Sequence, residues 1–146
     1  MTDLRARRSR AGLTQAELAA RSGVAQPNIA AYEAGRRRPS PATVARLNAA
    51  LAPLPSAQLR EHRDAAVRVL AAHKMSNPRV FGSVAQGQDH PGSDIDLLVD
   101  AADDLDLLDI VDAAEALESI LGSHVDIVTS RSLRPGHEIT RTARAL

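Results

Sequence analysis

The segment RVFGSVAQGQDHPGSDIDLLVD, residues 79 to 100, decides the fold of most of this chain. It predicts a short apolar strand that ends at Gly82-Ser83, a loop rich in glycine and glutamine, and a second strand that begins near Asp94. Ten residues separate Ser83 from Asp94. Because side chains alternate between the two faces of a strand, Asp94 and Asp96 are predicted to project together from the face opposite the apolar one.

This pair of carboxylates is typical of a site for a metal ion and phosphate. Like charges side by side repel, which calls for a counter-cation, and carboxylate oxygens suit Mg²⁺ alongside substrate phosphates. Gly82 has no Cβ and lets backbone amides approach a ligand, while Ser83 adds a hydroxyl donor for a phosphate oxygen. A third acid, Asp126, lies in the strand-like run HVDIVT on the face opposite Val125. A neighbouring strand would direct Asp126 at the same cations.

Each of these residues also has a simpler explanation. An isolated Asp-x-Asp at the start of a strand is often a solvated turn, and Ser83 alone can merely close one. Asp126 alone can be a charge that protects an edge strand from aggregation. The Gly-Ser pair at this spacing from the two aspartates favours the site.

Gly82-Ser83, the ten-residue spacing, Asp94-x-Asp96 and the later Asp126 together resemble the motif of the DNA polymerase β-like nucleotidyltransferases. The short length resembles the minimal, antitoxin-type branch of that family, and the resemblance covers residues 57 to 146. It implies that the three aspartates are catalytic and hold two Mg²⁺ ions, and that Asp126 also helps to activate the attacking hydroxyl. It further implies that the Gly-Ser turn binds the triphosphate of ATP.

The chain departs from the pattern directly after the Gly-Ser pair. Many minimal members carry arginines there, where this chain has Val84 and Gln86. The departure bears on the affinity for the triphosphate and not on the metal site. The basic residues nearest in sequence that could contact phosphate are Arg79, Arg131 and Arg134.

Residues 4 to 51 predict a compact set of four short helices. Thr14 followed by Glu17 is a capping-box pattern that starts the second helix, and Gly23 ends it. Pro27 fits the first turn of a third helix. A fourth helix is predicted after Pro39-Ser40-Pro41, with apolar residues at helical spacing.

The sequence from GLTQAELAARSGV through YEAGRRRPS resembles the Cro and phage-repressor family of helix-turn-helix proteins, and the resemblance covers residues 4 to 51. In that family the third helix enters the major groove, and the start of the second helix and the turn after the third contact phosphates. The resemblance implies phosphate contacts by Gln15 and three consecutive arginines, and base contacts by Gln26 and Asn28. The alternatives are a solvated charge run and ordinary polar residues of a first helical turn. The implied DNA-binding residues are Gln15, Gln26, Asn28, Arg36, Arg37 and Arg38.

The 146 residues carry no net charge, but the charge is unevenly divided. Nine arginines and three acidic residues up to Leu51 give +6, while nine basic and fifteen acidic residues after it give −6. The basic part suits a polyanion such as operator DNA. No cysteine is present, which excludes disulfides and thiolate metal sites, and with no apolar leader the expectation is a cytoplasmic protein.

These observations predict a two-domain protein of the α plus α/β class. The domains are a helix-turn-helix bundle over residues 1–52 and a small nucleotidyltransferase fold, with a mixed sheet flanked by helices, over residues 57–146. Residues 53–56 form a proline-rich linker. One helix is predicted from residue 57 to about residue 74 and a last helix from 137 to 146. A further helix should bury the stripe Leu107, Ile110, Ala114, Leu117 and Leu121. The five histidines are interpreted as ordinary residues because they lack ligand spacing.

The sequence is compatible with three functions. The first is that of an antitoxin that represses its own operon. The resemblance implies that it transfers AMP from Mg-ATP to a hydroxyl, of tyrosine, on a companion helical ribonuclease toxin. The second is a catalytically inactive DNA-binding repressor or antitoxin that neutralises a partner by docking. The third, a small-molecule nucleotidyltransferase of the aminoglycoside-modifying type, is disfavoured because no second domain is evident to hold an antibiotic. A homodimer or a hetero-oligomer is expected.

Overall fold

The computed structural model describes residues 3–146, and the chain divides into two compact units between Pro53 and Leu54. The division falls inside the predicted linker. Helix α5 already begins at Pro55, so the last two residues assigned to that linker belong to a helix. None of the helices in the described part of the chain is long and apolar enough to cross a bilayer.

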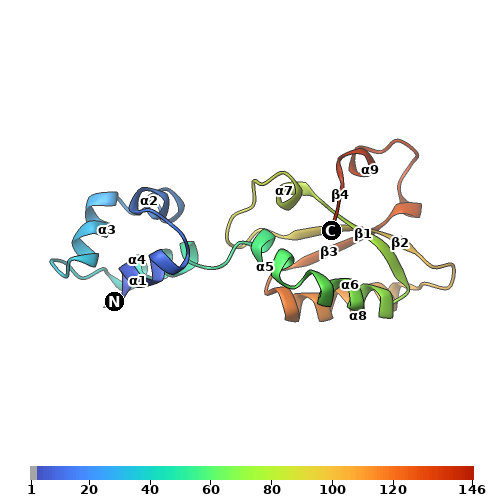
Figure 1. Cartoon of the computed structure of the whole chain (residues 1–146), viewed down its shortest axis with the longest axis horizontal. Coiled ribbons are helices and arrows are strands. Elements are labelled where there is room, and N and C mark those ends of the chain that lie inside the picture. The colour runs from blue at the N-terminus through green and yellow to red at the C-terminus, as the bar shows by residue number, and fades with distance from the viewer. Residues whose placement is uncertain (1–2) are drawn as a thin grey trace. The chain divides into compact units, whose positions relative to one another are not determined.

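The first unit consists of helices, as the sequence predicts (Figure 1). Thr14 and Glu17 form a reciprocal capping box, in which each side chain accepts a hydrogen bond from the backbone amide of the other. Gly23 then ends the helix at φ 70°, in the left-handed region. Leu18, Ile29 and Leu47 are fully buried in the apolar core of this unit. The helices are α1 (Leu4–Arg10), α2 (Gln15–Ser22), α3 (Gln26–Glu33) and α4 (Pro41–Ala50).

The second unit is built on a four-stranded mixed sheet in the order β3-β2-β1-β4. Strand β1 runs antiparallel to β2 and β4, while β2 and β3 are parallel. Helices α6 and α8 lie together along one face of the sheet and α9 lies on the other side (Figure 1). The strands are β1 (Met75–Phe81), β2 (Ile95–Ala101), β3 (Val125–Thr129) and β4 (Arg144–Ala145). The helices are α5 (Pro55–Glu61), α6 (Arg63–Ala72), α7 (Gly82–Ala85), α8 (Leu107–Leu121) and α9 (Glu138–Thr142), and a 3₁₀ turn spans Ser130–Ser132.

The middle of β2 is buried on both faces. Leu97, Leu98 and Val99 are consecutive and are all fully inaccessible to solvent. Leu97 and Val99 belong to the core beneath α6 and α8. Leu98 shares the opposite face with Asp96, so the sheet is covered on that face as well and only the ends of β2 remain accessible.

Several local predictions are wrong. The single helix predicted after residue 57 is two helices that meet at His62, whose ψ of 22° is not helical. The predicted loop after Gly82 begins with the helical turn α7. The predicted last helix ends early, and Arg144 starts a strand that pairs with β1. Leu107, placed in the buried stripe of α8, is 75% exposed, and the buried stripe is Ala113, Leu117 and Leu121.

Candidate functional site

The predicted acidic site lies where β2 and β3 begin and β1 ends. Asp96 is the register partner of Asp126 on parallel β3 and of Phe81 on antiparallel β1. Asp94 comes directly before β2, after a turn in which the buried Ser93 hydroxyl accepts a hydrogen bond from the His90 amide at 2.9 Å. Parallel pairing therefore brings together carboxylates that are thirty residues apart, as the sequence predicts.

The side chains of Asp94, Asp126 and His124 converge closely enough to share one ion. One potential ligand atom from each lies within 4.8 Å of the other two. The remaining predicted carboxylate, Asp96, is half-buried beside them, whereas Asp94 and Asp126 are exposed. The donor set fits a divalent cation, since hard oxygen ligands predominate.

The electrostatics of Asp96 also indicate a site for a cation. Burial raises the pKa of Asp96, the carboxylates of Asp126 and Asp94 raise it further, and only His124 opposes them. Like charges have thus been placed together in a partly desolvated position, an arrangement that a bound cation stabilises. Such a cluster contributes little to folding and is characteristic of functional sites.

Gly82 makes the close approach between β1 and the acidic cluster possible. Its φ is +71°, and a Cβ added there would collide with Oδ2 of Asp96. Both the conformation and the lack of space require glycine. Ser83 follows in the first turn of α7, half-buried. The predicted Gly-Ser turn therefore borders the predicted carboxylates.

His124 was missed by the sequence interpretation. It precedes Asp126 by two residues, and its Nε2 lies 3.1 Å from Asp126 Oδ1. Its Nδ1 lies 2.9 Å from Glu118 Oε1. Loss of hydration lowers the pKa of His124, but the carboxylates of Asp126 and Glu118 outweigh it and hold this pKa above its ordinary value. Strand periodicity was the available signal, because residues 124 and 126 must share a face.

Two of the three arginines predicted as phosphate contacts, Arg79 and Arg131, are engaged elsewhere, whereas Arg134 is exposed. Arg79 Nη2 pairs with Asp100 Oδ1 at 2.5 Å, and Ser130 donates to the same oxygen at 2.7 Å. Hydrogen bonds from Ser130 and Asn77, together with Arg79, lower the pKa of Asp100. Arg131 donates to two backbone carbonyls, those of Ala102 and Leu105. These contacts lie toward the opposite end of β2 from Asp94.

The predicted DNA-binding residues cluster around α3 in the first unit. Gln26 is exposed and Asn28 half-buried at the start of α3. Arg37, in the turn after α3, donates from Nη1 to Asn28 Oδ1 at 3.0 Å, so a predicted phosphate contact and a predicted base contact lie side by side. Gln15 donates to Glu33 Oε2 at 2.9 Å, which connects the start of α2 to the end of α3.

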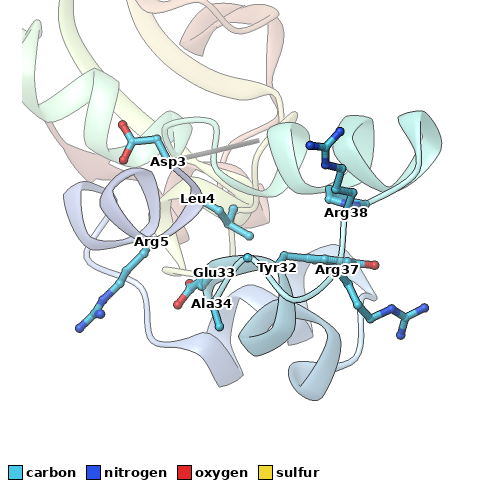
Figure 2. Close-up of a pocket in the computed structure, with 10 residues that line it drawn as sticks. Asp3, Leu4, Arg5, Tyr32, Glu33, Ala34, Arg37 and Arg38 are labelled. Carbon is cyan, nitrogen blue, oxygen red and sulfur yellow. The ribbon is translucent and has the colours of Figure 1, made fainter.

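A cavity of about 370 Å³ lies between the start of α1 and the turn after α3. Tyr32, Glu33, Arg5, Arg37 and Arg38 are among its lining residues. The guanidinium groups of the three arginines point away from one another (Figure 2). They are therefore spread as a basic surface and do not converge on one small anion. Arg36 is exposed next to them.

Two family profiles match this chain, and together they cover most of it. The helix-turn-helix profile matches residues 4–56 and the nucleotidyltransferase domain profile matches residues 76–145. A protein of Methanocaldococcus jannaschii, provisionally named a protein adenylyltransferase, is 34% identical over 77 residues, which are 53% of this chain and 83% of that protein. The protein adenylyltransferase MntA of Shewanella oneidensis is 49% identical over 53 residues, 36% of this chain and 38% of MntA.

One solved structure supports these matches. A structure provisionally described as a minimal nucleotidyltransferase is 39% identical and has a TM-score of 0.55, covering 62% of this chain and 93% of that one. A mutant of the toxin–antitoxin complex MntA-HpeT is 32% identical over 57% of this chain and 70% of that one, with a TM-score of 0.49. The chain belongs to the minimal nucleotidyltransferases and carries a Cro-type helix-turn-helix in front of the nucleotidyltransferase domain.

Proposed function

We propose that this chain is an antitoxin that transfers AMP from Mg-ATP to a hydroxyl group, that of a tyrosine, on a companion helical ribonuclease toxin. We further propose that it represses its own operon through the helix-turn-helix. The observation that carries the enzymatic part is the convergence of Asp94, Asp96 and Asp126 beside the Gly82 turn. The antitoxin role is supported by MntA, a relative that is named a protein adenylyltransferase and that occurs in a complex described as toxin–antitoxin.

The residues of the site would perform different parts of the reaction. Asp94, Asp96 and Asp126 would hold Mg²⁺, which neutralises the triphosphate and the leaving pyrophosphate when bound. The Gly82-Ser83 turn would orient the triphosphate through backbone amides and the serine hydroxyl. Asp126, exposed at the start of β3, would accept the proton of the acceptor hydroxyl. The hydroxyl oxygen then bonds to the α-phosphorus as the bond to pyrophosphate breaks, so AMP remains on the partner.

A docking antitoxin without catalysis is the second candidate, and one observation favours it. Residues 84 and 86 are Val and Gln, and Arg79 is paired with Asp100, so these positions supply no cation for the triphosphate. In that case the acidic cluster would be a remnant, and the chain would act by binding DNA and its partner alone.

The test is transfer of label from ATP to a co-purified partner. The purified full chain is incubated with Mg²⁺, ATP labelled at the α-phosphate, and the helical partner. Label is expected on the partner, and Asp94→Ala with Asp96→Ala should abolish it. Asp103→Ala with Asp112→Ala removes the same charge from exposed positions outside the cluster and should leave labelling intact. Failure of the wild-type chain to label the partner with any nucleotide would favour the docking function.

A further inference from the structure

His124 is held between two carboxylates, one on each ring nitrogen. Nδ1 lies 2.9 Å from Oε1 of Glu118, and Nε2 lies 3.1 Å from Oδ1 of Asp126. Glu118 is itself fixed, because the same oxygen accepts the backbone amide of Val125 at 3.1 Å. The orientation of the imidazole is thus set by α8 and by the first residue of β3, and Nε2 faces the acidic cluster.

This arrangement matches the usual environment of a histidine that binds metal. Such a histidine donates one ring N–H to a carboxylate or carbonyl, which fixes the tautomer and leaves the other nitrogen free to coordinate. If Nδ1–H donates to Glu118, the neutral ring presents the lone pair of Nε2 to a carboxylate oxygen of Asp126. Two acceptors facing each other at 3.1 Å need a positive charge, either a proton on Nε2 or a cation that both atoms bind.

The distances fit a shared cation. Ligand atoms about 2.1 Å from one metal lie about 3.0 Å apart when they are adjacent in an octahedron. The Nε2 to Oδ1 separation of 3.1 Å corresponds to such an edge. Asp94 contributes an oxygen within 4.8 Å of both, a distance that modest side-chain rotation closes, since Asp94 is exposed.

We propose that His124 is a nitrogen ligand of the metal at this site, oriented by Glu118, and that the site therefore binds Mn²⁺, which can replace Mg²⁺, more tightly than Mg²⁺ itself. Imidazole nitrogen binds first-row transition metals far better than it binds Mg²⁺, whereas carboxylates accept both. The inference rests on the proposed nucleotidyl transfer for the location of the site and adds a ligand and a metal preference to it.

The experiment uses the full chain and Mn²⁺ as the probe. Pulsed electron paramagnetic resonance of the Mn²⁺-loaded protein should show coupling to a ¹⁴N nucleus. The coupling should disappear in His124→Ala and in His124→Gln, and it should persist in His62→Ala, which removes a histidine at the junction of α5 and α6. Titration calorimetry should show Mn²⁺ affinity reduced at least about tenfold in His124→Ala, and Glu118→Gln should show a similar reduction while keeping the ¹⁴N coupling. Mg²⁺ affinity should change less than Mn²⁺ affinity in both variants.

Absence of ¹⁴N coupling in the wild-type chain would overturn the inference and would leave His124 as an ion-pairing residue. Disappearance of the coupling in His62→Ala would do the same, because it would assign the signal to another histidine. The two experiments test the metal ligand and the proposed transfer reaction independently. Label transfer that requires the aspartates, without nitrogen coupling, refutes only the metal ligand, whereas nitrogen coupling without transfer refutes only the reaction.

Discussion

At the scale of single residues, Gly82 is the position where a methyl group should be least tolerated. Gly82→Ala places a Cβ against Oδ2 of Asp96, so either the turn or the carboxylate must move. A misplacement of about 1 Å at a reacting centre can lower a rate about a hundredfold. We therefore expect AMP transfer to fall by about that factor, measured as the initial rate of partner labelling.

Gly87 supplies the matched control for this substitution. Its φ of +68° resembles that of Gly82, but apart from its chain neighbours no atom of residues 3–146 lies within 4 Å of its added Cβ. Gly87→Ala therefore introduces the same kind of backbone strain without the collision. If the activity of both variants fell equally, strain in the loop would explain the effect, and the contact with Asp96 would not.

A second residue-scale prediction concerns Glu33 in the helix-turn-helix unit. Its carboxylate pairs with Arg8 at 2.6 Å, and the two side chains are only 6% and 14% exposed. Glu33→Ala removes the carboxylate from a partly buried guanidinium, which keeps its hydrogen bond to the Leu13 carbonyl at 2.8 Å, and should cost about 2 kcal/mol. Urea unfolding followed by fluorescence of Tyr32, the only tyrosine in a chain without tryptophan, measures this unit selectively. Asp3→Ala breaks the exposed pair with Arg10 and should cost less than about 0.5 kcal/mol.

The same pair predicts an acid dependence. The hydrogen bond from Arg8 lowers the pKa of Glu33, the bond from Gln15 adds to it, and burial opposes both. A folded-state pKa below the ordinary value gives stability that is complete above the ordinary pKa and is lost as pH falls through the lowered one. The free energy of unfolding that is measured with Tyr32 should therefore fall as the pH drops below the ordinary pKa of glutamate. Glu33→Gln should reduce the dependence of this free energy on pH. An unchanged dependence would contradict the assignment to Glu33.

The sequence predicts the positions of Asp94, Asp96 and Gly82 because their pattern is local and strict. Strand alternation places Asp94 and Asp96 on one face, and the parallel register between β2 and β3 adds Asp126 to the cluster. His124 lacks ligand spacing to the other histidines, and only its position two residues before Asp126 indicates that it belongs to the cluster. Engagement of Arg79 by Asp100 depends on pairing between β1 and β2, which no local pattern reveals.

At the scale of elements, capping signals were predictive and packing was not. Thr14, Gly23 and Gly35 indicated the bounds of α2 and α3 closely, because capping residues act within one helical turn. The break between α5 and α6 has no such signal, as residues 57–74 contain neither glycine nor proline. The exposure of Leu107 likewise depends on where α8 meets its neighbours, which its periodicity does not specify.

One element-scale contact gives a further prediction. Leu54, the cap of α5, makes no side-chain capping bond, and the start of the helix is capped by Asp89. Oδ2 of Asp89 accepts the Ser56 amide at 2.8 Å, from the loop that joins α7 to β2. Asp89→Ala should cost about 1 kcal/mol, as removal of a helix cap does. It should also weaken ATP binding, since the same loop connects the Gly82 turn to Asp94.

Asp103→Ala is the control for this contact, because it removes an exposed acid from the turn before α8. Urea unfolding and nucleotide titration should both distinguish the two variants. Weaker ATP binding in Asp103→Ala to the same degree would show that the effect is not specific to the cap formed by Asp89. Unchanged stability in Asp89→Ala would contradict the capping role.

At the scale of the whole molecule, two units of opposite charge should perform separable tasks. The basic unit carries the predicted DNA contacts and the acidic unit carries the predicted transferase site. This division explains why a chain with no net charge can still be expected to bind a polyanion. The two activities should therefore respond to different substitutions.

Replacement of Arg36, Arg37 and Arg38 by alanine tests this separation. Removing one phosphate-binding arginine lowers the slope of log affinity against log salt by about 0.9, so removing three should lower it by almost 3. Arg37→Ala also releases Asn28 from its hydrogen bond, which should weaken discrimination among operators beyond the effect of charge. Mobility shifts with the upstream DNA at several salt concentrations measure both effects, and partner labelling should be unchanged.

The control variant replaces Arg60, Arg63 and Arg68 by alanine. This removes equal charge from exposed positions of α5 and α6 in the other unit. If the salt dependence of that variant fell to the same degree, binding would follow net charge and not a surface built around α3. Asp94→Ala with Asp96→Ala should leave the DNA affinity of the chain unchanged while abolishing transfer. Because the arginines at 36 to 38 lie on a different unit from the carboxylates, each variant should remove one activity and retain the other.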